Sequence, residues 1–227
     1  MCGTCGCTPV VIEQPVLLRN DNLAAHWRQR FATAGVPVIN LLSAPGSGKT
    51  ALLEALAREW PDPARVAVLV GDLATDNDAR RLQAAGLQAM QITTGQLCHL
   101  EMALLEPVLQ QLDLQALDLL VIENVGNMVC PAAFDLGESC RIVLVAISEG
   151  EDKPLKYPPL FVNADLVLIN KVDLAGAIAW QRELMHRHIR QVAPMAMVLE
   201  VSARNGQGIA TLQRLLPVLA GRGRGGG

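Results

Sequence analysis

The stretch Ser43-Ala44-Pro45-Gly46-Ser47-Gly48-Lys49-Thr50 decides how the rest of this 227-residue chain is interpreted. An apolar run at residues 36–42 leads into it, and a helical pattern of leucines and alanines follows it as far as Trp60. A strand, a glycine-containing loop and a helix in this order are the elements of a phosphate-binding P-loop. A glycine-rich turn without a ligand is the alternative, but the flanking strand and the Gly-Lys-Thr ending favour a nucleoside triphosphate site.

Each residue type in this loop has a chemical reason. Gly46 and Gly48 let the backbone bend tightly, so that successive N–H groups point at phosphate oxygens. The start of the following helix adds partial positive charge. Lys49 reaches the β- and γ-phosphates, and the Thr50 hydroxyl can bind Mg²⁺. Ser43 replaces the usual first glycine, which leaves the turn feasible. The predicted phosphate-binding residues are Pro45, Gly46, Ser47, Gly48, Lys49 and Thr50.

The composition fits an α/β protein. Hydrophobic residues make up 51% of the chain and the mean hydropathy is +0.28, as expected where parallel strands are buried on both faces. We therefore predict a doubly wound, mostly parallel sheet in a three-layer α/β/α fold. No apolar run approaches the roughly 20 residues of a membrane span, and the first residues do not resemble a signal peptide. The net charge of −3 gives no reason to expect a nucleic-acid partner. These features predict a cytoplasmic protein whose six cysteines stay reduced.

Three of the cysteines, Cys2, Cys5 and Cys7, form an N-terminal cysteine cluster. Three thiolates this close can chelate one soft or borderline metal ion. With the amine of Cys2, freed by removal of Met1, the donor set suits square-planar Ni²⁺ or tetrahedral Zn²⁺. A redox-reactive or incidental cluster is the alternative. We expect residues 1–19 to be a flexible metal-binding tail, residues 20–220 a nucleotide-binding domain, and residues 221–227 a flexible glycine-rich tail.

Two acidic residues follow predicted buried strands. Asp72 follows residues 66–70, a strand expected beside the P-loop strand, at the edge of the sheet where Mg²⁺ and phosphates bind. Glu123 follows residues 119–122, and Gly126 comes three positions later. This is the arrangement of a Walker B switch, in which the acid serves Mg²⁺ and the glycine N–H binds the γ-phosphate. The candidate catalytic residues are Lys49, Thr50, Asp72, Glu123 and Gly126. The candidate magnesium ligands are Thr50, Asp72 and Glu123.

The sequence Asn170-Lys171-Val172-Asp173 follows a predicted strand at residues 165–169. The Asp173 carboxylate can accept hydrogen bonds from guanine N1–H and from its 2-amino group, which adenine does not offer. Asn170 is expected at the base edge, and the stem of Lys171 against the ring face. The motif therefore predicts GTP as the nucleotide. The predicted last loop of the guanine site is Ser202, Ala203 and Arg204.

Cys98 and His99 are predicted at the first turn of a helix that begins near Gln96. Alone, the pair would be interpreted as a buried core residue beside a surface residue. Cys130, however, follows Gly126 by four positions, so a thiol lies on the segment expected to sense the γ-phosphate. We expect Cys130 to move with the nucleotide state, whereas Cys98 and His99 need not move in step.

Taken together, these motifs resemble the HypB family of hydrogenase nickel-incorporation GTPases, and the resemblance extends over essentially the whole chain. It implies a fold of the signal-recognition-like GTPase class that dimerises on GTP. It also implies that the GTPase delivers Ni²⁺ to the immature large subunit of [NiFe]-hydrogenase, together with a nickel- and zinc-binding accessory protein, HypA.

The resemblance further implies two metal sites. Cys98, His99 and Cys130 would form a nickel or zinc site near the dimer interface. The N-terminal cysteine cluster would match the separate high-affinity nickel site of some members. The histidine-rich stretch of other members is absent and the chain has four histidines, so bulk nickel storage is not expected.

Two other functions are weighed against this one. Urease-maturation GTPases share the switch arrangement, but they lack a Cys-x-x-Cys-x-Cys start and carry a Cys-x-His motif, whereas Cys98 and His99 are adjacent. The second is a metal sensor or sequestering protein in which the nucleotide is only a structural ligand, and a measurement of GTP turnover separates it. Slow intrinsic turnover is expected, because Asn127 follows Gly126 and there is no glutamine here of the kind that orients the attacking water in Ras-type enzymes.

Overall fold

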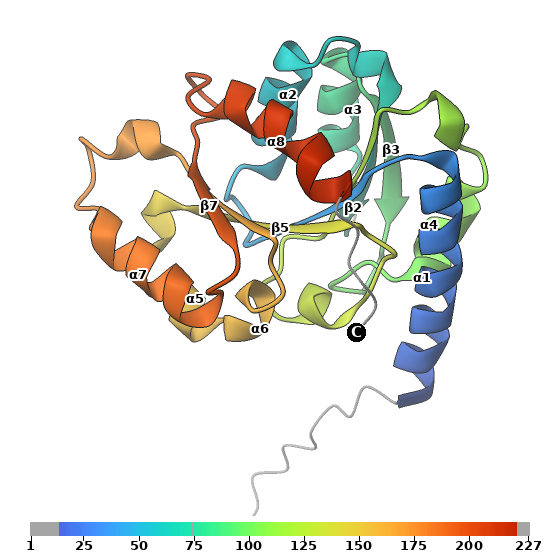
Figure 1. Ribbon diagram of the computed structural model, residues 1–227, viewed down its shortest axis with the longest axis horizontal. Coiled ribbons are helices and arrows are strands. Elements are labelled where there is room, and N and C mark those ends of the chain that lie inside the picture. Colours follow the sequence, from blue (N-terminus) through green and yellow to red (C-terminus); the bar gives the residue numbers. More distant parts are fainter. Residues whose placement is uncertain (1–13, 74, 222–227) are drawn as a thin grey trace, which may run out of the picture.

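The computed structural model describes residues 14–73 and 75–221. Its centre is a seven-stranded, all-parallel sheet with the strand order β3-β2-β4-β1-β5-β6-β7. The strands are β1 (Val38–Ser43), β2 (Val66–Asp72), β3 (Gln88–Thr93), β4 (Leu119–Glu123), β5 (Cys140–Ala146), β6 (Leu166–Asn170) and β7 (Met197–Glu200). This confirms the predicted doubly wound α/β fold (Figure 1).

The composition of the strands explains why the sheet is central. β1, β4, β5 and β6 are buried at every position and consist mainly of Val, Ile and Leu. Strands covered on both faces carry such continuous apolar runs, with no alternation of polar residues. Asn40 in the middle of β1 and Arg141 near the start of β5 are buried polar exceptions. Groups of this kind need hydrogen-bond partners inside the protein.

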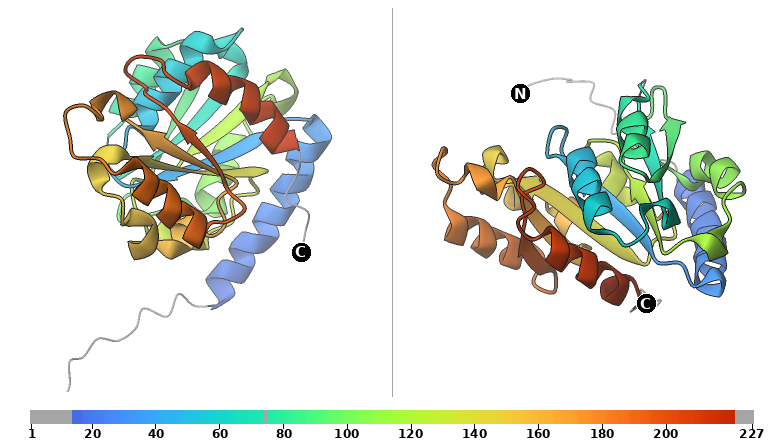
Figure 2. Two further views of the ribbon diagram at one scale, coloured as in Figure 1. Left: turned by 60° about the vertical axis from the view of Figure 1, so that its left-hand side comes forward. Right: turned by 90° about the horizontal axis from the view of Figure 1, so that it is seen from above.

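The helices form the two outer layers (Figure 2). One face of the sheet is covered by α2 (Lys49–Glu59), α3 (Asn77–Ala84) and α8 (Ile209–Gly221). On the other face, the half around β2 and β4 is covered by α1 (Gln14–Ala34) and α4 (Met102–Leu109). The half around β5 and β6 is covered by α6 (Pro158–Phe161) and α7 (Arg182–Val192), with the short α5 (Lys153–Lys156) next to them.

The sequence pattern predicts helices at residues 20–34 and 177–192, but both begin at other positions. α1 begins at Gln14, where the following proline is tolerated because a proline in the first turn of a helix needs no N–H partner. α7 begins at Arg182. There the N–H of Gln181 donates to the Glu151 carboxylate over 2.7 Å, so the helix starts after that contact.

Residues 14–19, predicted as part of a flexible tail, belong to α1. The N-terminal cysteine cluster and residues 222–227 lie outside the described residues, so the predictions made for them stay predictions. Within residues 14–73 and 75–221, no helix is both long and apolar enough to cross a membrane.

Candidate functional site

The P-loop joins β1 to α2 at the edge of the sheet where the parallel strands end. Gly46 and Gly48 have φ angles of 74° and 100°, in the left-handed region that glycine enters at little cost. α2 begins at Lys49, so the positive end of its dipole faces the loop. A Cβ added to Gly48 would lie 2.8 Å from Nδ2 of Asn170. The close approach of the segment after β6 therefore also requires glycine here.

Lys49, Thr50 and Glu123 form the polar centre beside this loop. Thr50 Oγ1 donates to Glu123 Oε1 over 3.0 Å, and Lys49 Nζ donates to Ser43 Oγ over 3.1 Å. Burial raises the pKa of Glu123 to about 7, against the opposing effects of Lys49 and of the Thr50 hydrogen bond. Burial also lowers the pKa of Lys49 below its usual value, although the Glu123 carboxylate opposes that shift.

This centre offers the oxygen ligands that Mg²⁺ prefers. Glu123 is 3% exposed, and its Oε2 has no hydrogen-bond partner within the described part of the chain. A buried carboxylate oxygen left in that state is costly, and a divalent cation would supply the missing partner. The carboxylate of Glu123 and the hydroxyl of Thr50 therefore fit a magnesium ion.

Asp72 lies farther from the P-loop strand than predicted. The expectation that its strand neighbours β1 is wrong, because β4 separates β2 from β1. A crossover connection can skip a position in the sheet, and the apolar run of β2 does not reveal which position it takes. Asp72 Oδ1 accepts the N–H of Thr75 over 3.0 Å. Asp72 is still among the charges that act on Lys49, and its role as a magnesium ligand stays a prediction.

The segment after β6 contacts the P-loop directly. Asn170 Nδ2 donates to the carbonyl of Ser47 over 2.9 Å, and Lys171 Nζ donates to the carbonyl of Gly46 over 2.7 Å. Asn170 Oδ1 also accepts the N–H of Ala203 over 3.3 Å. Asn170 therefore braces the P-loop against the last loop of the site, a role that the sequence did not indicate.

Asp173 is oriented by the same last loop. Ser202 Oγ donates to Asp173 Oδ1 over 2.6 Å, and Ser202 is fully buried. Arg204 is exposed. A carboxylate held through one oxygen keeps lone pairs for further donors, so Asp173 can still accept the two N–H groups of a guanine edge.

Cys98, His99 and Cys130 come together, and we call them the internal metal cluster. Their ligand atoms all lie within 4.8 Å of one another, and all three residues are half-buried. Cys98 Sγ is 3.9 Å from His99 Nδ1 and 2.7 Å from Cys130 Sγ. The hydrogen bond to Cys130, together with burial, raises the pKa of the Cys98 thiol, and burial lowers the pKa of His99. Two thiols and a neutral imidazole are a donor set for Zn²⁺ or Ni²⁺.

The segment that carries two ligands of this cluster is not helical. The prediction of a helix from Gln96 is wrong, because α4 begins at Met102. Buried asparagine side chains from other elements accept hydrogen bonds from backbone N–H groups of this segment. The N–H of Leu100 donates to Asn124 Oδ1 over 3.2 Å, and the N–H of Met102 donates to Asn20 Oδ1 over 2.9 Å. These long-range hydrogen bonds override the local helical preference.

His99 also stacks on Phe134, with the ring centroids 3.9 Å apart and the planes inclined by 20°. Phe134 is buried and follows Cys130 closely in the chain. The stacking therefore ties the two halves of the internal metal cluster to each other.

The charges and prolines of residues 149–159 predict a surface loop, but Glu149 and α5 contact the P-loop and the segment after Gly126. Ser47 Oγ donates to Glu149 Oε1 over 2.6 Å, so this carboxylate holds a side chain of the P-loop in place. Lys153 Nζ lies 3.9 Å from the sulfur of Met128, on the segment between Gly126 and Cys130. These contacts could not be predicted from the sequence, because a charged, proline-containing stretch is typical of solvated loops.

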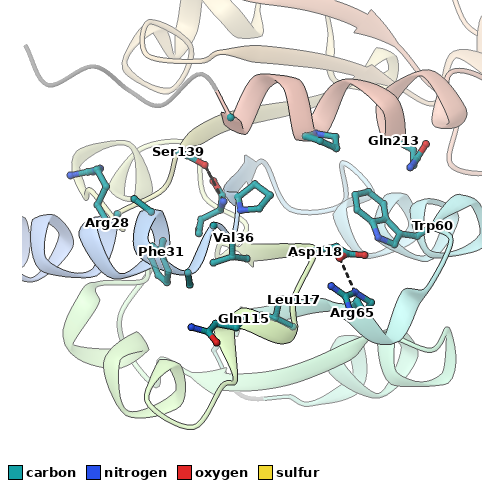
Figure 3. A pocket seen from close by; sticks show the side chains of 18 of the residues that line it. Arg28, Phe31, Val36, Trp60, Arg65, Gln115, Leu117, Asp118, Ser139 and Gln213 are labelled. Carbon is teal, nitrogen blue, oxygen red and sulfur yellow. Dashed lines mark hydrogen bonds and ion pairs between the residues drawn. The ribbon is translucent and has the colours of Figure 1, made fainter.

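A separate cavity of about 1030 Å³ lies at the opposite edge of the sheet (Figure 3). Val36, Leu117 and Ser139, which precede strands, line it, as does an ion pair of 2.7 Å between Arg65 and Asp118. Open parallel sheets bind their ligands outside the carboxyl ends of the strands. This cavity is therefore distinct from the nucleotide site.

The parallel sheet and the loop after β1 define a P-loop nucleotide-binding protein. Residues 37–200 match the family described as CobW/HypB/UreG, nucleotide-binding domain. The chain is 47% identical over 204 residues to the hydrogenase maturation factor HypB of Azotobacter chroococcum, and the match covers 88% of this chain but 66% of that relative. The chain belongs to the HypB family of hydrogenase maturation factors.

Two solved structures of HypB proteins are similar over 90% of this chain. The structure of HypB from Helicobacter pylori in complex with nickel has a TM-score of 0.85 and 38% identity, with 96% of that chain covered. HypB from Archaeoglobus fulgidus has a TM-score of 0.82 and 35% identity, with 100% of that chain covered.

Proposed function

We propose that the chain is a GTP-hydrolysing nickel metallochaperone that assists nickel insertion into [NiFe]-hydrogenase. The observation that carries this proposal is the position of the internal metal cluster. Cys130 lies four positions beyond Gly126, on the segment that leaves β4 next to the buried carboxylate of Glu123. A metal site attached to the nucleotide-sensing segment is what a nucleotide-controlled metal carrier needs. The relative from Helicobacter pylori has been solved with nickel, which supports nickel as the cargo.

The proposed GTPase centre uses the residues around the P-loop. Lys49 stabilises charge on the β- and γ-phosphates, and the N–H of Gly126 binds the γ-phosphate. A Cβ on Gly126 would lie 3.0 Å from the Cα of Pro45, so a larger residue here would press on the backbone of the P-loop. Thr50 and Glu123, with Asp72, would hold Mg²⁺, which when bound neutralises the phosphate oxygens.

Base selection is assigned to the loops after β6 and β7. Asp173 accepts the guanine N1–H and 2-amino group, and Ser202 fixes the direction of its carboxylate. Lys171 lies over the ring face from its left-handed backbone position, with a φ of 62°. The last loop of the guanine site is again Ser202, Ala203 and Arg204.

The metal part has two proposed sites. The internal metal cluster binds Ni²⁺ or Zn²⁺ near the interface of a GTP-dependent homodimer, and the N-terminal cysteine cluster binds Ni²⁺ as a separate site. The proposed partners are the nickel- and zinc-binding protein HypA and the precursor of the hydrogenase large subunit, in the cytoplasm.

A metal titration combined with a GTPase assay tests this function. Cys130→Ala removes one of three ligands and should lower the affinity of the internal metal cluster by at least about 10- to 100-fold, because even residues behind a metal ligand have effects of that size. Cys140→Ala is the matched control, since Cys140 is another cysteine of the same domain but is fully buried in β5 and lies outside the cluster. Both measurements use full-length protein with Cys2→Ser, Cys5→Ser and Cys7→Ser, so that only the internal site is titrated. Equal losses in both variants would contradict the assignment, and GTP binding without turnover would favour a metal sensor.

A further inference from the structure

Next to the segment that carries Cys98 and His99, four buried polar side chains are joined by hydrogen bonds at the central strands of the sheet. They are Asn40, Asn124, Glu138 and Arg141, and none is more than 4% exposed. Asn124 Nδ2 donates to Asn40 Oδ1 over 3.2 Å, and Asn40 Nδ2 donates to Glu138 Oε1 over 3.4 Å. Arg141 donates to the same Glu138 oxygen through Nε and Nη2, over 2.9 and 2.6 Å. Apolar residues of similar volume often serve stability equally well, so such a network points to a positioning role.

Asn124 is the member of this network that bonds both functional segments. It directly follows Glu123 in the turn formed by residues 123–127. Its Oδ1 accepts the N–H of Val125 over 3.0 Å and the N–H of Leu100 over 3.2 Å. Leu100 directly follows His99. One side-chain oxygen therefore joins the turn that is expected to sense the nucleotide to the segment that carries two metal ligands.

The Cys130 half of the internal metal cluster is anchored elsewhere. Arg141 donates through Nη1 to the carbonyl of Ala132 and through Nη2 to the carbonyl of Phe134, over 3.2 Å in each case. Both carbonyls follow Cys130 in the chain. The buried ion pair with Glu138, 2.6 Å long, fixes the guanidinium that holds them. The segment after Cys130 is therefore attached to β5, whereas the Cys98 and His99 segment is attached to the turn after β4.

We propose that Asn124 is a positioning residue that transmits the nucleotide state from residues 123–127 to Cys98 and His99. The inference rests on the proposed function, in which GTP and GDP hold this turn differently. When the turn moves, the Asn124 oxygen carries Leu100 and the two preceding ligands with it, while Arg141 retains the segment after Cys130. The distances among the three ligands then change, and so does metal affinity. This proposal reverses the sequence-based expectation, in which Cys130 moves with the nucleotide state and Cys98 and His99 need not move in step.

Asn20 provides a matched control. It is 5% exposed, its Oδ1 accepts the N–H of Met102 over 2.9 Å, and its Nδ2 donates to the carbonyl of Asp135 over 2.8 Å. It therefore holds the same metal-carrying segment through the same type of side chain, but it reaches that segment from α1. A change at Asn20 tests the effect of loosening the segment without cutting its link to the turn.

The first experiment measures the Zn²⁺ and Ni²⁺ dissociation constants with GDP and with a non-hydrolysable GTP analogue. It uses the full chain carrying Cys2→Ser, Cys5→Ser and Cys7→Ser. Coupling between two sites typically changes affinity by roughly 5- to 150-fold, and we expect a ratio in that range between the two states. Asn124→Ala should bring the ratio to within about twofold of one, whereas Asn20→Ala should keep it. Spatial proximity alone does not establish coupling, so this ratio is the deciding quantity.

The second experiment needs no variant and therefore does not depend on whether Asn124→Ala folds. Amide hydrogen exchange reports the opening of individual backbone hydrogen bonds. In the same full-length background, the Leu100 amide should exchange at different rates with GDP and with the GTP analogue, and the Met102 amide at equal rates.

The outcomes separate this inference from the proposed function. Two results would overturn the role of Asn124 without affecting the proposed metallochaperone function. One is a metal affinity that still depends on the nucleotide in Asn124→Ala. The other is a Leu100 amide that exchanges at the same rate with GDP and with the GTP analogue. Equal metal affinities in both states before any change at Asn124 would overturn the link and the switching itself. If the internal metal cluster bound no metal in either nucleotide state before any change at Asn124, the proposed function would be rejected.

Discussion

The P-loop and the internal metal cluster are built in opposite ways. The P-loop is one continuous stretch, residues 43–50, shaped by glycine backbone and by the start of α2. The internal metal cluster joins residues 32 positions apart, and it depends on contacts from Asn20 in α1, Asn124 in the turn after β4 and Phe134 just beyond Cys130. A site shaped by its own backbone is preformed. A site assembled from several elements can change when any one of them moves, which suits the proposed metal carrier, because its metal must be both held and released.

The largest effect should come from Lys49→Ala, which tests whether the two sites can be separated. Removing the ammonium group takes away stabilisation of the transferring phosphoryl group, and the loss of one such group typically costs 10²- to 10³-fold or more in kcat. We expect GTP hydrolysis to fall by about 1000-fold or beyond detection. Metal affinity measured without nucleotide should stay within about twofold, because coupling acts only through a bound nucleotide.

The control for this variant is Lys153→Ala, which removes a lysine near Met128 while the P-loop lysine remains. If Lys49→Ala abolished metal binding in nucleotide-free protein, the two sites could not be considered independent, and the contrast drawn above would fail.

The same contrast explains what could be predicted from the sequence. The P-loop and residues 170–173 are contiguous motifs, so their residue types and spacing carry the chemistry directly. The sequence also singled out Cys98, His99 and Cys130, which the structure brings together. The prediction that Cys98 and His99 lie on a helix was wrong. The hydrogen bonds with Asn124 and Asn20 that prevent this helix come from residues distant in the chain. The position of β2 was likewise missed, since strand order is a property of the connections and not of the apolar run.

Asp173→Asn should have the second largest effect, and it acts on the nucleotide site alone. Two hydrogen bonds to a charged acceptor, worth about 1.5–3 kcal/mol each, are lost or reversed for guanine. GTP affinity should fall by about 100-fold or more, and xanthosine triphosphate should become the better ligand, because its 2-oxo group accepts the new amide N–H. Competition binding with GTP, ATP and xanthosine triphosphate measures this. A variant that still preferred GTP would show that Asp173 does not read the base.

Glu123→Gln should reveal a pH dependence of folding stability in protein without nucleotide or metal. Burial raises the pKa of this carboxyl from 4.5 to about 7. Between these two values the folded protein keeps a proton that the unfolded chain has already released, so stability falls as the pH rises through this window. The difference amounts to on the order of 3 kcal/mol. Glutamine cannot titrate in this range. The free energy of unfolding of the variant should therefore fall less than that of the unmodified protein as the pH rises from 4.5 to about 7.

Denaturant unfolding of both proteins at several pH values between 4 and 8 measures the difference, and Mg²⁺ provides the control. A bound cation favours the ionised carboxylate, so adding Mg²⁺ and GDP to the unmodified protein should flatten its curve toward that of the variant. Parallel curves for the two proteins without ligand would mean that Glu123 is not the titrating group, and the fit of Glu123 to magnesium would lose its electrostatic support.

Phe134→Leu should have the smallest effect, and it acts on the metal side of the comparison. The Phe134 ring stacks on His99 and keeps the imidazole beside the two thiols. Aromatic pairs contribute about 0.5–1.5 kcal/mol beyond their buried area, so Zn²⁺ or Ni²⁺ affinity should fall by about 2- to 12-fold. Phe31→Leu is the matched control, because Phe31 belongs to the same hydrophobic core but packs on Trp27. If a site assembled from several elements depends on each of them, only Phe134→Leu weakens metal binding, and GTP affinity stays unchanged in both. Equal weakening in the two variants would mean that general loosening of the core sets metal affinity, and that this stacking contact does not.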